Sequence, residues 1–251
     1  MIPLADIQHF EWAALLVAVA ALVRGYTGFG FAAIAITGLN LIWPPQLSVP
    51  VILLLDLVGT LGLLKPAYQY VDRPLIVRLG AGALIGIPGG LLILTQLPES
   101  LLKLTISFSV LGMTLILFRR PQSAARSLTT GKTCLIGSVS GAFTAAASVG
   151  GLPVVCYLLG SGLSPQVQRA SMVVILAATD LLALLLLYLN DVFDADLLTP
   201  FLMLILPTLI GVQLGQWGFH RLQPASFHSV ALPVLTALSL SGVGLGIYRI
   251  F

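Results

Sequence analysis

Residues 24–30 read Arg24-Gly25-Tyr26-Thr27-Gly28-Phe29-Gly30 and separate two short apolar runs, residues 12–23 and 31–43. As a helix, each run is about 18 to 20 Å long at about 1.5 Å per residue, whereas the hydrocarbon core of a bilayer is about 30 Å thick. A similar break, at residues 146–153, interrupts the apolar region 133–163. Both regions, 12–43 and 133–163, are therefore predicted to be re-entrant helical hairpins, which enter and leave the membrane on the same side.

The rest of the chain is also strongly apolar. Of its 251 residues, 58% are hydrophobic and only 8% are charged, against roughly 25% charged in soluble domains. Uninterrupted apolar runs of about 18 to 23 residues are long enough to cross a bilayer. Such runs lie at 47–64, 74–96, 101–118, 171–189, 197–219 and 226–248. The predicted fold class is an all-α polytopic membrane protein.

The two halves of the chain resemble each other. Three matches occur in the same order, at shifts of 125, 121 and 124 residues: 85–90 with 210–215, 27–30 with 148–151, and Asp56 with Asp180. Matches that keep their order indicate an internal repeat. Each repeat would hold one hairpin and three crossings, an odd number, so the second repeat is predicted to be inverted. Repeat 1 is assigned to 1–118, a cytoplasmic loop to 119–132, and repeat 2 to 133–251.

The basic residues favour one orientation of this topology. With re-entrant hairpins, one face receives Lys65, Arg73, Arg78, Arg119, Arg120, Arg126, Lys132, Arg169 and Arg221, and the other receives Lys103 and Arg249. If the hairpins were full crossings, the division would be 8 to 3 instead of 9 to 2. Basic residues accumulate on the cytoplasmic side of membrane proteins. Both termini are therefore predicted to lie outside.

Arg24 is the clearest candidate for a functional residue, because ionisable side chains are costly at membrane depth. A glycine-rich turn follows it, and the start of a second short helix offers free N–H groups and a positive dipole end to an anion. The second break, at residues 146–153, likewise contains glycines and precedes the start of a short helix. A competing interpretation is that the glycines pack helices together and that Arg24 either snorkels to the membrane interface or pairs with an acid. The candidate substrate-binding residues are Arg24, Gly25, Tyr26, Thr27, Gly28, Phe29, Gly30, Ser148, Val149, Gly150, Gly151 and Pro153.

Asp56 and Asp180 lie in the middle of two predicted spans that the repeat makes equivalent. Two interpretations stay open for them. They could neutralise Arg24, or they could carry protons as the coupling ion, because a buried carboxylate needs a partner or a proton in either case.

The sequence gives little support for an enzyme, an ATP-dependent protein or a nucleic-acid-binding protein. The chain contains neither an HExxH nor a GxSxG motif and no Walker-type nucleotide loop, so an enzyme or an ATP-dependent protein is not expected. Its 12 basic and 9 acidic residues give a net charge of +3, too little for a nucleic-acid surface. No cofactor or metal site is predicted. A site between inverted repeats is typical of secondary transporters.

The breaks also carry a family resemblance. Residues 25–30, Ser140-Gly141 and the stretch 148–155 resemble the sulfite exporter TauE/SafE family, also called the toluene sulfonate uptake permeases. The likeness extends over roughly residues 12–248. It implies movement of sulfite, a sulfonate or sulfoacetate across the bacterial cytoplasmic membrane, with the lipid bilayer and a small sulfur-containing anion as partners. Together with the inverted repeats, this favours a secondary transporter that works by alternating access. An anion channel of the same architecture is the alternative. The exact anion, the direction, the coupling ion and the oligomeric state stay open, a homodimer among the alternatives.

Overall fold

The computed structural model describes residues 10–119, 129–193 and 197–221, together with Thr236 and Leu240. Within these residues every regular element is a helix, which confirms the predicted all-α class. The helices are α1 (Phe10–Thr27), α2 (Phe31–Leu39), α3 (Pro45–Ala67), α4 (Arg73–Gln96), α5 (Glu99–Arg119), α6 (Thr130–Ala147), α7 (Gly151–Leu158), α8 (Pro165–Leu189) and α9 (Leu198–Arg221).

Five of these helices, α3, α4, α5, α8 and α9, are long and apolar enough to cross a membrane. They overlap the expected spans at 47–64, 74–96, 101–118, 171–189 and 197–219. The sixth expected span, 226–248, lies outside the described residues apart from two isolated positions. The chain is therefore a multi-pass helical membrane protein.

The two predicted hairpins each consist of one long and one short helix. α1 and α6 have 18 residues each, about 27 Å at about 1.5 Å per residue, whereas α2 has nine and α7 has eight. The sequence pattern placed the end of the first arm at residue 23, but α1 continues to Thr27. Arg24 therefore lies in the last turn of a helix, because its side chain finds buried partners there and Gly25 packs closely on α9.

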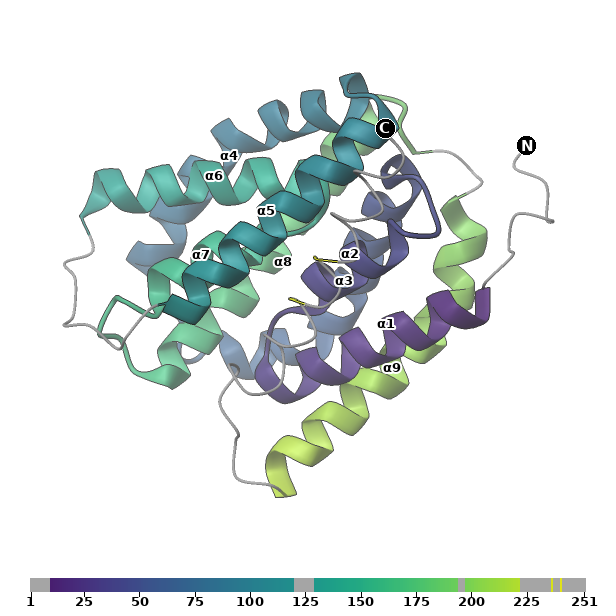
Figure 1. The fold of residues 1–251 in the computed structure, drawn as a ribbon. Helices are drawn as coiled ribbons and strands as arrows, with labels where there is room; N and C mark the ends of the chain where they lie inside the picture. Colours follow the sequence, from purple (N-terminus) through teal and green to yellow (C-terminus); the bar gives the residue numbers. More distant parts are fainter. Residues whose placement is uncertain (1–9, 120–128, 194–196, 222–235, 237–239, 241–251) are drawn as a thin grey trace.

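Glycines bring α4 into close contact with α6, and α1 into close contact with α9 (Figure 1). A Cβ atom on Gly82 or Gly86 of α4 would lie 1.9 Å from the Cys134 or Ser138 carbonyl oxygen of α6. A Cβ atom on Gly215 of α9 would lie 2.2 Å from the Leu22 carbonyl oxygen of α1. Only residues without a side chain allow backbones to approach so closely. Each pair joins the first half of the chain to the second.

The centre of the protein is formed by α3 and α8, which pack against each other, with the short helices α2 and α7 beside them (Figure 1). Buried apolar side chains from all four helices belong to one core. Two acidic residues, Asp56 of α3 and Asp180 of α8, are buried in this region. Their helices hold them beside the tips of the two hairpins.

Candidate functional site

A small cavity lies where the two hairpin tips meet α1, α3 and α8. It is lined by Arg24, Phe29, Gly30, Ala32, Ala33, Asp56, Ser148, Val149, Gly150, Gly151, Leu152, Leu176 and Asp180. The two sequence breaks, more than a hundred residues apart, thus both line one site. The charged groups in its lining are one arginine and two aspartates.

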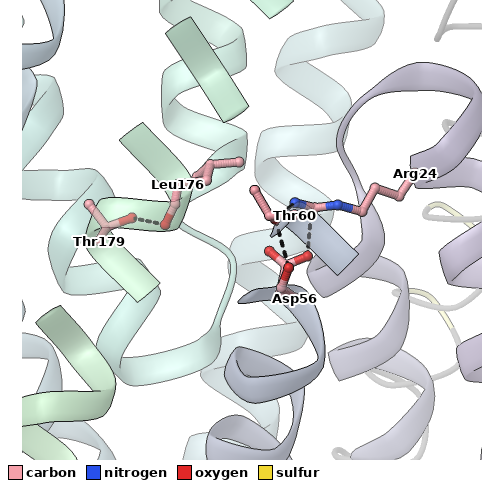
Figure 2. A network of polar contacts seen from close by, with 5 residues as sticks. All are labelled: Arg24, Asp56, Thr60, Leu176 and Thr179. Carbon is pink, nitrogen blue, oxygen red and sulfur yellow. Dashed lines mark hydrogen bonds and ion pairs between the residues drawn. The ribbon is translucent and has the colours of Figure 1, made fainter. Parts of the chain in front are cut away.

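Arg24 makes an ion pair that crosses from α1 to α3 (Figure 2). Its Nη1 donates a hydrogen bond to Asp56 Oδ1, and its Nη2 donates one to Thr60 Oγ1. Thr60 Oγ1 in turn donates to the Asp56 carbonyl oxygen at 2.6 Å. Asp56 and Thr60 are four residues apart, one helical turn, so α3 presents both to the same guanidinium. Arg24 is 1% exposed, and the pair shields most of its charge from the surrounding hydrocarbon.

One nitrogen atom of the Arg24 guanidinium makes no hydrogen bond within the described part of the chain. Its Nε is buried and has no hydrogen-bond partner among the described residues. A buried N–H group without an acceptor costs about 1 to 3 kcal/mol, and in a cavity that cost favours an incoming acceptor. The guanidinium therefore contacts Asp56 and Thr60 through two nitrogen atoms, and within the residues that the structure describes its Nε–H group is left without an acceptor.

Both short helices begin at the cavity without a side-chain cap. The N-cap residues are Gly30 for α2 and Gly150 for α7, and glycine has no side chain that could accept from the first turn. By contrast, Asp72 caps α4 and Ser164 caps α8. The first N–H groups of a helix lack intrahelical partners, and its N-terminus carries about half a positive charge.

In α7 the Leu152 N–H group already donates to the Val149 carbonyl oxygen at 3.1 Å. Pro153 has no N–H group, so Gly151 provides the first-turn N–H group there. The positive ends of two helices at one cavity suit an anion.

The hairpin tips are held rigidly by specific contacts. Ser148 has a left-handed backbone, with φ 58°, and its hydroxyl donates to the Val49 carbonyl oxygen of α3 at 3.0 Å. The Ser140 hydroxyl donates to the Gly150 carbonyl oxygen at 2.7 Å. In the other hairpin, Gly28 has φ 88° and lies under the side chain of Arg169, which would be 2.7 Å from an added Cβ atom. These contacts fix where the two helix ends point.

Comparison with known proteins connects this site to a transporter family. The family model described as sulfite exporter TauE/SafE matches residues 13–242, which include both hairpins and the cavity. The chain belongs to this family. No curated protein and no solved structure matches the chain significantly. The resemblance read from residues 25–30 and 148–155 is thus confirmed, and the TauE/SafE assignment makes the chain a membrane transporter.

The structure divides the predicted site residues of this TauE/SafE protein into two groups. Those that line the cavity are Arg24, Phe29, Gly30, Ser148, Val149, Gly150 and Gly151, joined by Asp56 and Asp180. The others lie outside its lining: Gly25 and Tyr26 contact α9, Gly28 contacts Arg169, and Pro153 is buried in α7. Thr27 ends α1, and its side chain is outside the described atoms.

Sequence reasoning missed several residues of the TauE/SafE site. Thr60 is a partner of Arg24, and Leu176, Ala32 and Ala33 line the cavity. Thr60 could have been predicted from its spacing, because a hydroxyl one turn after the mid-span Asp56 lies on the same helix face as that aspartate. Leu176 lies one turn before Asp180, and its carbonyl oxygen accepts from Thr179 at 3.0 Å (Figure 2). Nothing in the sequence distinguishes Leu176 from other leucines of α8.

The cavity has a volume of about 20 Å³. That is room for about one water molecule, and a sulfite ion has four heavy atoms. The hairpin tips and α8 must therefore separate before such an anion is accommodated. Leu176 is in the way, because its Cδ1 atom would be 3.3 Å from a Cβ atom on Gly151.

Proposed function

We propose that this TauE/SafE protein is a secondary transporter that moves a small sulfur-containing oxyanion, of the sulfite, sulfonate or sulfoacetate type, across a bacterial cytoplasmic membrane. The observation that carries the proposal is the convergence of a buried Arg24 and two uncapped helix N-termini on one cavity. A sulfonate or sulfite group has three acceptor oxygens, which suit the free Nε of Arg24 and the backbone N–H groups of α2 and α7.

Alternating access between two inverted repeats is the proposed mechanism. Two relations support it. α1 packs on α9 as α6 packs on α4, so each hairpin contacts the second span of the other half of the chain. Gly86 and Gly211, which the sequence comparison aligned, both make close contacts in these pairs. A site at the interface between such repeats opens to either side as one repeat moves against the other.

A carrier is favoured over an anion channel by the size of the site. Conduction requires a continuous path for the anion, and a cavity with room for about one water molecule is too narrow to be part of such a path. In a carrier, the gradient of an unlabelled anion drives a labelled anion against the labelled anion's own gradient. A channel does not couple the two movements in this way. Counterflow of a labelled anion in liposomes therefore separates them, and a channel would show only dissipation.

The substrate is tested directly by calorimetry on purified protein. Sulfite, sulfate, thiosulfate, sulfoacetate and an aromatic sulfonate form the panel, with acetate as a planar carboxylate control. We expect binding of at least one sulfur anion and weaker binding of acetate, whose two oxygens make fewer contacts. Failure of every sulfur anion to bind would contradict the proposed function.

A further inference from the structure

The two aspartates of the cavity have different surroundings. Asp56 is paired with Arg24. Asp180 is 3% exposed and lines the same cavity, where its side chain contacts that of Asp56; its Oδ2 has no hydrogen-bond partner among the described residues. A buried carboxylate without a counter-ion is costly, because burial removes its hydration. Asp180 is therefore the carboxylate of this site whose negative charge still needs compensation.

The charged groups that act on Asp180 come from two neighbouring helices. They are Asp56 of α3, which repels its charge, and Arg24 of α1, which attracts it. α4, α6 and α7 also contact α8, and within the described residues they contribute no further charge to Asp180. Because Arg24 already compensates Asp56, the three side chains together carry one net negative charge when both aspartates are ionised.

The two helix ends are the further source of positive charge at this cavity. The N-termini of α2 and α7 contribute about half a positive charge each, about one in total. An ionised Asp180 and a bound monovalent anion would both depend on this single unit of positive charge. The positive charge of the cavity therefore suffices for a bound anion or for an ionised Asp180, and both are present together only if one of them is neutralised.

We propose that Asp180 takes up one proton for each monovalent anion that binds in the cavity, so that anion and proton cross the membrane together. This inference rests on the proposed anion site. The proton comes from the aqueous phase to which the site is open and leaves with the anion on the other side. Asp180 carries it in place of Asp56, because a neutral Asp56 would leave Arg24 without its partner.

Two consequences follow for transport. A proton and a monovalent anion carry no net charge, so each cycle is electroneutral and insensitive to the membrane potential. An inward proton gradient drives the anion inward, and outward movement requires an outward anion gradient larger than the inward proton gradient.

Calorimetry with methanesulfonate tests the inference. This probe keeps one negative charge at neutral pH, whereas sulfite itself changes protonation there. Titration in two buffers with different ionisation enthalpies counts the protons taken up. We expect about one proton per anion for the parent protein, and an affinity that rises as pH falls, by up to about tenfold per pH unit. Asp180→Asn should bind methanesulfonate with no proton uptake and no pH dependence.

The matched control is Asp191→Asn, which removes one exposed carboxylate just beyond α8 and should behave as the parent. A second measurement needs only the parent protein: in liposomes, methanesulfonate uptake should respond to a pH gradient and not to an imposed potassium diffusion potential. Binding without proton uptake, or uptake driven by the potential, would overturn the role of Asp180 and leave the anion site standing. Absence of binding for methanesulfonate and for every sulfur anion of the panel would overturn the proposed function itself.

Discussion

Arg24 of α1 and Asp56 of α3 form an ion pair with side chains only 1% and 5% exposed, so neither charge meets bulk water. Such a pair is expensive to break, because removal of one partner leaves the other buried and uncompensated, at a cost of about 3 to 5 kcal/mol. The pair holds α1 on α3 at the cavity, and it also fixes the direction of the remaining Arg24 donor.

Replacement of Arg24 should weaken anion binding in two steps. Arg24→Lys keeps the charge and loses the fork of donors, and Arg24→Ala loses both. For Arg24→Ala we expect a loss of roughly 10- to 100-fold in affinity, since a hydrogen bond to a charged group contributes about 1.5 to 3 kcal/mol. Calorimetry on monodisperse protein measures it. Lys103→Gln, which removes an amine paired with Glu99 far from the cavity lining, is the control.

The double change Arg24→Ala and Asp56→Ala separates binding from charge balance. Removing both partners leaves no uncompensated charge, so thermal stability in detergent should recover most of what Arg24→Ala loses. Anion binding should stay weak, because the Nε donor is still absent. Recovery of full affinity in the double variant would mean that Arg24 serves only as the counter-ion of Asp56.

Gly151 is predicted to control the size of the binding cavity. An added Cβ atom there meets only the Leu176 side chain, at 3.3 Å, so Gly151→Ala should fold normally and lower anion affinity. Gly150→Ala should fail to fold well, since its Cβ atom would lie 2.5 Å from the Ser140 carbonyl oxygen. Gly131→Ala, with open space around it, is the control. Gly151→Ala with unchanged affinity would exclude this wall from the anion site.

Glycine positions on α4 should differ sharply in their tolerance. A Cβ atom on Gly86 would lie 1.9 Å from the Ser138 carbonyl oxygen, whereas one on Gly89 would have nothing within 4 Å. Gly86→Ala is therefore expected to separate α4 from α6 and to lower the melting temperature markedly. Gly89→Ala should leave it equal or higher, because alanine favours the helix by about 1 kcal/mol. Equal melting temperatures for the two variants would contradict the close contact.

Cysteine labelling tests the re-entrant topology. Gln69 and Asn190 are exposed in loops at the ends of α3 and α8. Single cysteines at these positions, in a protein without Cys134 and Cys156, should react with an impermeant maleimide from opposite sides of the membrane. If the second hairpin were a full crossing, both would react from the same side.

The fold class and much of the cavity lining could be predicted from the sequence because they depend on local signals. Glycines that interrupt an apolar run mark a helix break, and Arg24 beside such a break marks a polar site. The end of α1 was less predictable, since Gly25 and Tyr26 pack on α9, a helix far away in the sequence. Which helices pack against each other was also not predictable, because it depends on surfaces of helices that lie far apart in the sequence. Nothing local to Gly86 indicates that Ser138 lies opposite it.

The glycine contacts also bear on how the chain assembles. The glycine faces of α4 and α9 contact helices from the opposite half of the sequence, so α1 and α4 are synthesised before their partners α9 and α6. The helix packing of the first half therefore cannot be complete until the second half of the chain has been made. Two fragments divided between α5 and α6 should accordingly each be degraded when made alone and should assemble when made in the same cell.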